Sequence, residues 1–298
     1  MVPPIIHEIE ARSAINAVRG MPFKWSLNPY KGCVHGCGYC YARAYHGFLG
    51  LPVSTFDSQI FAKTNIAAVL EVELHKPSWA FEPIAIGTAT DPYQRFEGQY
   101  RLTRACLETL ARVDNPGSVT TKGTLVTRDV DVLADLASRT EFAVNVSLIT
   151  LDREIARTIE PGAPAPMSRL RAIERLGAAG IPVSLFLAPV LPGITDAPEQ
   201  IEAVVRAAAE HGARDVWAGT LRLAPDVREH FFQIVARHFP QLRQGYQRFY
   251  SGATYAPTAY QLRVEGLVGA QRRAAGLGTT PTHGESSRQR RGQLALPI

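Results

Sequence analysis

The sequence is poor in cysteine, with four in 298 residues, and it contains no long uninterrupted apolar run. So few cysteines in a chain of this length exclude the disulfide-dense scaffold of a small secreted domain. Without a run of about 18 apolar residues, no membrane span is expected. The first residues, Met1–Glu8, lack the basic region and apolar stretch of a signal peptide. We therefore expect a globular protein of the reducing cytoplasm.

The charge of the chain is small and unevenly placed. The formal net charge is +5, and from Gln271 onward five arginines stand against a single glutamate, Glu285. The part before Gln271 is therefore close to neutral, and we expect the basic character to lie in a tail. With 46% apolar and 20% charged residues, the chain has an ordinary globular composition and is long enough for one large α/β domain or two small ones.

Three of the four cysteines stand close together. Cys33, Cys37 and Cys40 have the spacing C-x3-C-x2-C, and Tyr39 directly precedes the last of them. Three thiolates from one short loop can bind three irons of a cubane [4Fe–4S] cluster, which leaves the fourth iron open to a small molecule. Glycines at positions 32, 36 and 38 allow the backbone to wrap closely around such a bulky group.

This motif resembles the signature of the radical S-adenosylmethionine (SAM) superfamily. In that family the open iron binds the amino and carboxylate groups of SAM, and reduction of the cluster cleaves SAM to a 5′-deoxyadenosyl radical. The resemblance implies a partial (β/α)6 barrel, Tyr39 beside the cofactors, and an electron donor of the flavodoxin or ferredoxin type.

A structural zinc site is the alternative for the same cysteines, with His35 or His46 as the fourth ligand. Zinc sites of this kind usually combine a C-x2-C pair with a second pair further along the chain. The sequence has no second pair, because Cys106 stands alone inside an expected helix. There it fits a small apolar core position better than a catalytic one. We therefore favour the cluster.

Beyond the cysteines, apolar runs alternate with helix-like segments. This alternation predicts a parallel sheet with helices on its faces, in about six βα units. The fold class is thus α/β, a partial (β/α)6 TIM-type barrel of parallel strands, although the pattern alone would also fit an open doubly wound sheet. The expected strands are 23–27, 84–88, 119–121, 142–149, 183–188 and 215–219, and the expected helices are 40–49, 66–74, 103–113, 128–138, 168–179, 197–210 and 225–238.

The chain divides into four expected segments. Residues 1–22 are a proline-containing lead-in, and residues 23–240 form the barrel, with the cysteine loop at its N-terminal end. Residues 241–275 are an extension whose tyrosines cover the barrel. Residues 276–298, rich in Gly, Thr, Pro, Ser and Arg, have the composition of a disordered basic tail.

Polar residues gather where the expected strands end, which is where parallel barrels carry their chemistry. Asn145 and Ser147 share one face of a strand, and such groups need partners that a ribose or sulfonium ligand, a neighbouring strand or water would supply. The residues expected to bind SAM are Tyr39, Thr88, Thr90, Asp91, Asn145, Ser147, Arg169, Pro189 and Gly193.

Several of these residues have an ordinary structural alternative. Asp91 with the following proline can simply turn the chain and cap a helix. Lys122 can reach a carboxylate or phosphate, or it can be a solvated loop residue. Arg169 can hold the SAM carboxylate, or it can form an ion pair with Glu160.

Six stretches together resemble the spore photoproduct lyase-like branch of the superfamily. This resemblance implies a nucleic-acid base as the substrate, in a repair or modification reaction. In the lyase a cysteine at the end of the second strand returns a hydrogen atom, but the corresponding stretch here, Gly87–Asp91, contains none. Tyr93 and Lys122 are the candidate catalytic residues. The matching stretches are Asn28–Tyr30, Cys40–Arg43, Thr90–Gln94, Thr121–Lys122, Arg128–Asp129 and Ala188–Asp196.

The last six residues give a separate indication of a partner. They resemble the short Gln-Leu-x-Leu peptides that dock on the sliding DNA clamp, with Gln293 at the rim of a pocket and Leu294, Leu296 and Ile298 inside it. A chance apolar terminus is the alternative. Two other functions also fit the sequence: radical SAM modification of a protein or small molecule, and a non-enzymatic, zinc-stabilised adaptor of the clamp.

Overall fold

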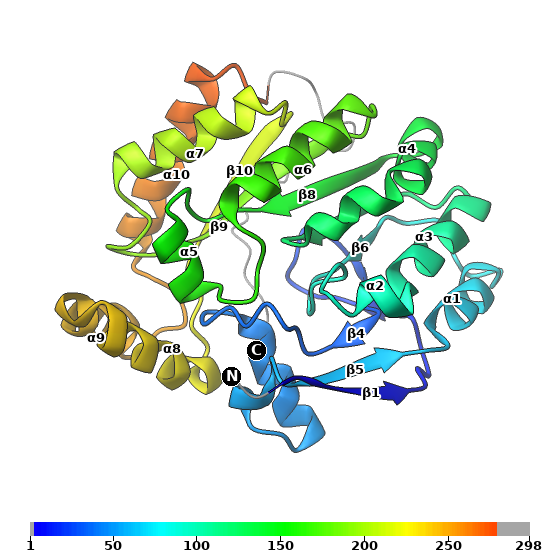
Figure 1. Cartoon of the computed structure of the whole chain (residues 1–298), viewed down its shortest axis with the longest axis horizontal. Helices are drawn as coiled ribbons and strands as arrows, with labels where there is room; N and C mark the ends of the chain where they lie inside the picture. The colour runs from blue at the N-terminus through cyan, green and yellow to red at the C-terminus, as the bar shows by residue number, and fades with distance from the viewer. Residues whose placement is uncertain (1–2, 279–298) are drawn as a thin grey trace.

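A curved, mostly parallel sheet forms the centre of the computed structural model, which describes residues 3–278 (Figure 1). Seven strands follow the order β10-β9-β8-β7-β6-β3-β2, and only β2 is antiparallel to its neighbour. The six parallel strands form the predicted partial (β/α)6 barrel. The strands are β2 (Ile15–Ala17), β3 (Trp25–Leu27), β6 (Ile84–Ile86), β7 (Gly117–Thr121), β8 (Phe142–Ser147), β9 (Val183–Val190) and β10 (Asp215–Thr220).

A second, three-stranded sheet lies beside the barrel and was not expected from the sequence. Its order is β1-β5-β4, with β1 (Ile5–Ile9) parallel to β5 (Gln59–Lys63) and β4 (Tyr30–Lys31) antiparallel to it. Residues 5–9 therefore form a strand in the segment expected to be a lead-in. Strands this short give little periodic signal, and the pairing of β1 with β5 joins segments more than fifty residues apart.

Helices surround the barrel, and several coincide with the expected ones. Those at 66–74 and 225–238 have the expected bounds, whereas the helix expected from 128 begins at Val130, after a 3-10 turn. No helix in residues 3–278 is long and apolar enough to cross a membrane. The helices are α1 (Ile66–Leu74), α2 (Glu97–Tyr100), α3 (Leu102–Arg112), α4 (Val130–Arg139), α5 (Arg153–Ile159), α6 (Pro166–Ala178), α7 (Pro198–Glu210), α8 (Pro225–His238), α9 (Arg243–Tyr250) and α10 (Thr258–Ala274), with 3-10 helices η1 (Tyr41–Leu49), η2 (Val53–Thr55), η3 (Thr124–Asp129) and η4 (Pro240–Leu242).

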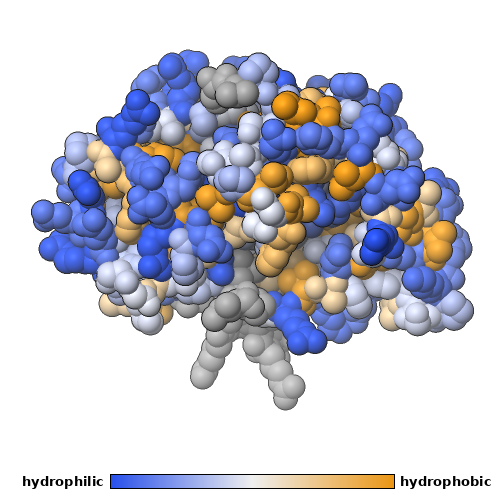
Figure 2. Space-filling view, turned by 90° about the horizontal axis from the view of Figure 1, so that it is seen from below, coloured by the Kyte–Doolittle hydropathy of each residue, from blue (hydrophilic) through white to orange (hydrophobic). Residues whose placement is uncertain are grey.

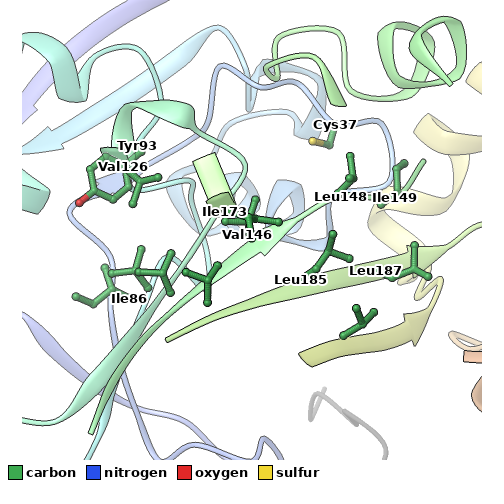
Figure 3. Close-up of a cluster of buried hydrophobic side chains, with 14 of the residues drawn as sticks. Cys37, Ile86, Tyr93, Val126, Val146, Leu148, Ile149, Ile173, Leu185 and Leu187 are labelled. Carbon is green, nitrogen blue, oxygen red and sulfur yellow. The ribbon is translucent and has the colours of Figure 1, made fainter. Parts of the chain in front are cut away.

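The two faces of the barrel strands differ in burial. On the outer face, side chains such as Val146 and Leu185 pack under the helices, against Ile173 of α6 (Figure 3). Burying each side chain of this size contributes about 1.5–3 kcal/mol. The alternate positions of β7, β8 and β9, among them Thr120 and Asn145, face the inside of the barrel and are half-buried, except for the buried Ser147. The inside of the barrel is therefore open to a ligand.

The helix α10 lies along β10, the last strand of the barrel. Arg272 of α10 donates two hydrogen bonds to the carboxylate of Asp215, at 2.7 and 2.6 Å, and its guanidinium carbon lies 5.1 Å from the centroid of the Trp217 ring. Residues 241–275, expected as an extension that covers the barrel, thus contain α9 and α10, and the latter covers β10. The rest of the expected tail, 279–298, lies outside the described residues.

Candidate active site

The cysteine loop contains Cys33, Cys37 and Cys40 and lies between β3 and η1. The side chains of Cys33 and Cys37 are buried and that of Cys40 is half-buried, and all three are free thiols. Gly32 and Gly36 have φ angles of +78° and +64°, which L side chains rarely adopt, so glycine is required at both turns. The fourth cysteine is fully buried in α3, as expected for a core residue.

A buried arginine fixes the backbone of this loop. Arg43 donates from Nε to the carbonyl oxygen of Cys37 and from Nη2 to that of Gly36, both at 2.9 Å. The carboxylate of Asp57 lies 3.5 Å from Nη2 and balances the charge. The planar fork of donors allows one side chain to hold two carbonyl groups. Sequence reasoning gave Arg43 no role of its own, and its place three residues after Cys40 was the available signal.

The segment after β6 holds the loop from the other side. Gln94, fully buried, accepts a hydrogen bond from the backbone N–H of Val34 and donates one to the carbonyl oxygen of Gly32, at 3.1 and 3.2 Å. The hydroxyl of Thr90 donates to the same carbonyl at 2.6 Å. Thr90, expected to bind SAM, is thus engaged with the cysteine loop, and Gln94 was missed because its partners lie some sixty residues away.

Asp91 ties the loop to the end of β7. Its carboxylate accepts hydrogen bonds from the hydroxyl of Thr121 at 2.6 Å and from the backbone N–H of Lys122 at 2.7 Å, and it lies 3.2 Å from Nδ1 of His35. Although burial opposes the charged form, His35 and these donors hold the pKa of Asp91 well below its usual value. The carboxylate of Asp91 also accepts a hydrogen bond from the backbone N–H of Tyr93 at 2.9 Å. The structure therefore gives Asp91 several partners within the protein. Its expected role in binding SAM stays a prediction.

A buried ion pair stands behind the second cysteine. Nη2 of Arg169 lies 2.6 Å from Oε2 of Glu160, and both side chains are 1% exposed. The hydroxyl of Tyr39 donates to Oε1 of Glu160, and the amino group of Lys122 lies 3.8 Å from the same oxygen. Although burial opposes its charged form, Arg169 and Lys122 hold the pKa of Glu160 below its usual value.

The ion pair bears on two of the residues expected at the cofactor site. Besides the pair, Arg169 donates to the carbonyl oxygens of Ser147 and Pro164, at 3.0 and 2.8 Å. The structural alternative for Arg169 is thus present, and binding of a SAM carboxylate would have to compete with it. Lys122 is not a solvated loop residue, because its side chain is only 17% exposed and its amino group lies 3.8 Å from the carboxylate of Glu160.

The polar residues on the inside of the barrel have weak protein partners. Asn145 and Ser147 make their hydrogen bonds, to Thr120 Oγ1 and to the carbonyl oxygen of Ala188, at 3.5 Å, the upper limit for such a bond. Donors and acceptors held this loosely can turn to a ligand. Of the expected residues, these two are the best placed to meet SAM.

The remaining expected cofactor residues lie on three different segments. Thr88 follows β6, and its carbonyl oxygen accepts a hydrogen bond from the hydroxyl of Tyr41. Pro189 lies in β9 after a cis peptide bond, and Gly193 lies in the turn after it, against Leu242 of η4. Their expected contact with SAM stays a prediction.

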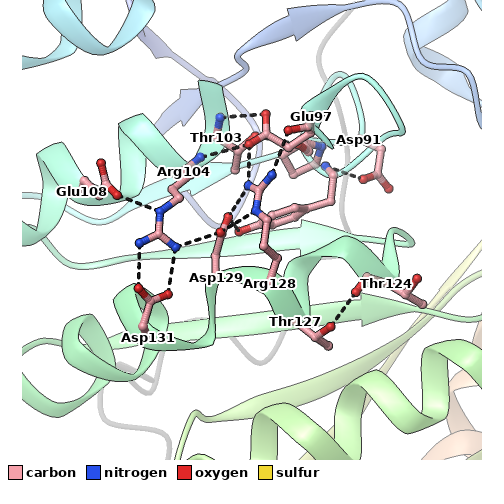
Figure 4. A network of polar contacts seen from close by, with 12 residues as sticks. Asp91, Glu97, Thr103, Arg104, Glu108, Thr124, Thr127, Arg128, Asp129 and Asp131 are labelled. Carbon is pink, nitrogen blue, oxygen red and sulfur yellow. Dashed lines mark hydrogen bonds and ion pairs between the residues drawn. The ribbon is translucent and has the colours of Figure 1, made fainter. Parts of the chain in front are cut away.

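Figure 4 shows a network of Glu97, Arg104, Arg128 and Asp129 between η3, α2 and α3, and Tyr93 bonds to it. The hydroxyl of Tyr93 donates to Asp129 at 3.1 Å, and Asp129 also binds Arg128 and Arg104. Glu97, at the centre of the same network, binds Arg128 at 2.9 Å. The hydroxyl of Tyr93 is thus bonded to Asp129, among the helices. The hydroxyl of Tyr41, in contrast, bonds to Thr88, at the end of β6.

The close approach of Gly162 to the cysteine loop gives a test of the loop's position. A Cβ on Gly162 would lie 2.1 Å from the carbonyl oxygen of Val34, so the loop would have to move. We expect Gly162→Ala to lower the iron bound after reconstitution by at least about half, since ligand geometry controls metal affinity. The matched variant Gly177→Ala, whose Cβ would meet its nearest atom at 3.6 Å, is expected to bind iron normally. Equal iron content in both variants would contradict this position of the loop.

The donor set of the loop fits a cubane cluster. Three free thiols lie in one loop, and soft thiolates are the ligands that iron–sulfur clusters use. Burial raises the pKa of Cys33 well above its usual value and that of Cys37 to about 12, so metal binding would release protons. In residues 3–278, no three His, Cys, Asp or Glu side chains converge on one point where a single metal ion would sit. A cubane differs from a single ion in that each thiolate binds a different iron.

Comparison with known proteins identifies relatives of the whole barrel. The sequence model of the radical SAM superfamily matches residues 27–208. An uncharacterised protein of Mycobacterium tuberculosis is 40% identical over 86% of this chain and 76% of its own length. An uncharacterised protein of Methanocaldococcus jannaschii is 27% identical over 64% of this chain and 70% of its own.

Among solved structures, spore photoproduct lyase has a similar fold. In its complex with the dinucleoside spore photoproduct, the TM-score is 0.67 at 14% identity, over 90% of this chain and 79% of that chain. A mutant of the lyase with bound AdoMet and the same dinucleoside gives a TM-score of 0.65 over the same shares. These likenesses show a common fold.

Proposed function

The chain belongs to the radical SAM superfamily, and we propose that this enzyme acts on a base of nucleic acid, in a repair or modification reaction. One observation carries the proposal: the fold matches spore photoproduct lyase over nine-tenths of the chain, in a complex with a dinucleoside lesion. The sequence stretches that resemble that branch include those at the ends of β6, β7 and β9.

The cofactors of the family are a [4Fe–4S] cluster and SAM, which together supply a 5′-deoxyadenosyl radical. Cys33, Cys37 and Cys40 would hold three irons. Asn145 and Ser147, whose protein hydrogen bonds are long, would turn to SAM inside the open barrel. The zinc-stabilised adaptor is not supported, since the chain is a member of an enzyme family.

The residue that returns a hydrogen atom to the substrate is a tyrosine in this proposal. The stretch Gly87–Asp91 lacks the cysteine that does so in the lyase. Tyr41 is better placed than Tyr93, because it directly follows Cys40 and its hydroxyl reaches the end of β6. Burial raises the pKa of Tyr41 above its usual value, so the phenol keeps its hydrogen at neutral pH.

The proposed function predicts that damaged nucleic acid stimulates SAM cleavage. On anaerobically reconstituted protein with dithionite, we expect release of 5′-deoxyadenosine to rise about tenfold with ultraviolet-irradiated DNA over undamaged DNA, because substrate binding energy assembles the reactive complex. The Tyr41→Phe variant is expected to release 5′-deoxyadenosine but to convert less lesion per molecule released. Stimulation by a peptide or small molecule, with none by nucleic acid, would contradict the proposal and favour the other substrate classes.

Three further features belong to the same proposal. A cytoplasmic location and a flavodoxin- or ferredoxin-type electron donor follow from the chemistry of a reduced cluster. Docking on the sliding clamp through Gln293, Leu294, Leu296 and Ile298 stays a prediction from the sequence, because these residues lie outside the described part of the chain.

A further inference from the structure

Three aromatic side chains form a row along η1 that starts beside the third cysteine and ends in solvent. The ring centroids of Tyr41 and Tyr45 are 6.3 Å apart, edge to face, and those of Tyr45 and Phe48 are 6.2 Å apart, stacked. Exposure increases along the row: Tyr41 is half-buried, Tyr45 is 42% exposed and Phe48 is 86% exposed. Contiguous exposed apolar groups of this kind mark interaction sites more often than single ones do.

An arginine with a buried, unpartnered donor follows the last strand of the barrel. Burial raises the pKa of Tyr41 and Tyr45, and the positive charge of Arg222, which follows β10, acts in the opposite direction on both. Its guanidinium carbon lies 5.9 Å from the centroid of the Tyr255 ring. Its Nε is buried and has no hydrogen-bond partner in residues 3–278. A buried donor without an acceptor is costly, so it indicates an acceptor that arrives with a ligand.

The segments that carry the row and Arg222 contain no negatively charged residue. The segments 41–49, 219–225 and 250–256 contain no aspartate or glutamate. Two hydrogen bonds join the last two segments, from the N–H of Leu223 to the carbonyl oxygen of Thr254 and from the hydroxyl of Tyr250 to that of Leu221. Figure 2 views the molecule from below, the side on which β1 lies in Figure 1. Apolar side chains, in orange, are exposed across the middle of this face. Such a surface suits an anionic ligand with flat apolar faces.

We propose that the aromatic row and Arg222 bind unpaired bases of single-stranded nucleic acid next to the reacting base. Every base has a flat face that stacks on an aromatic ring, and arginine binds phosphate oxygens. An apolar protein surface would leave Nε of Arg222 without an acceptor, and a merely acidic ligand would make no use of Phe48. The proposal rests on the proposed function, because it takes nucleic acid as the substrate and adds where its flanking bases lie.

The test compares binding of two probes to the full-length reconstituted protein, by fluorescence anisotropy without reductant. One probe is oligothymidylate and the other is an abasic oligonucleotide of the same length, so phosphate contacts are equal in both. We expect the protein to bind the first about tenfold more tightly, and Phe48→Ala to bring the ratio close to one, because stacking requires the base. Phe48→Trp should preserve the ratio. The control Leu262→Ala, a 59% exposed position on α10, should preserve it as well.

Two results would overturn this inference. One is an unchanged ratio in Phe48→Ala, and the other is a loss of binding that sedimentation traces to the loss of a dimer. Release of 5′-deoxyadenosine without nucleic acid should be the same in the control Leu262→Ala and the parent enzyme. If base-dependent binding is found but lesions do not stimulate SAM cleavage, the proposed reaction fails while the stacking surface stands. If SAM cleavage responds to lesions but Phe48 does not affect binding, only the stacking surface fails.

Discussion

Replacing Cys37 with alanine is expected to abolish cluster binding and SAM cleavage together. Reconstituted parent protein should carry about four irons per chain, and the variant less than about one, because a cubane held by two thiolates is easily lost. Iron and sulfide analysis, visible absorption and 5′-deoxyadenosine release measure the effect. The last of these should fall to the level of protein-free controls.

The fourth cysteine supplies the matched control. Cys106→Ala removes a thiol that is fully buried in α3, and we expect normal iron content with a stability loss of about 1 kcal/mol for the lost sulfur. Parent protein that binds one zinc per chain and gives no visible absorption would contradict the assignment of the loop. So would a Cys37→Ala variant with parental iron content.

Replacing Arg169 with leucine is expected to cost about 3–5 kcal/mol in the free energy of unfolding. The change leaves the carboxylate of Glu160 buried and short of its main counter-charge, and breaking a buried ion pair on one side has this effect. Urea denaturation at neutral pH measures it. The control Arg157→Leu breaks an ion pair whose partners are 78% and 81% exposed, and no measurable loss is expected.

The pH dependence of this variant gives a second measurement. In the parent, the pKa of Glu160 is below its usual value in the folded state, so the pair stabilises the fold above the unfolded pKa and loses effect as the pH falls. Without Arg169, the pKa of the buried carboxyl should rise, and the variant then binds a proton more readily when folded. We therefore expect the stability difference between parent and variant to shrink from neutral pH towards about pH 4.

A double variant distinguishes charge from packing. Arg169→Leu combined with Glu160→Leu removes both charges, and it should recover much of the lost stability. A double variant no more stable than Arg169→Leu alone would mean that the hydrogen bonds of Arg169 to the Ser147 and Pro164 carbonyls carry the effect.

The barrel and the cysteine loop were predictable because their signals lie within one segment each. A buried parallel strand reads as an apolar run, and the three cysteines occupy one loop. The bounds of α1 and α8 also follow from local features, such as Pro225 at the first position of α8. The short helix α5 was missed, although Asp152 marks its start by accepting hydrogen bonds from Glu154 and Ile155.

The partners of individual polar side chains were not predictable, because they come from distant segments. Gln94 binds the backbone of Gly32 and Val34 across some sixty residues, and Glu160 binds Tyr39 across more than a hundred. A polar residue at a strand end has the same appearance in the sequence whether it meets a ligand or the protein. Thr90 has a protein partner in the cysteine loop, and its expected contact with SAM stays a prediction.

The position of α10 along β10 has a consequence for the behaviour of the protein in solution. Among residues 3–278, β10 pairs only with β9, so one side of it has a row of backbone groups without a neighbouring strand, and such rows template aggregation. Arg272 pins α10 over this row through Asp215 and Trp217. The helix α10 thus protects β10 from edge-to-edge association. A chain truncated before Thr258 would keep every cysteine but would expose β10 to pairing with a strand of another molecule.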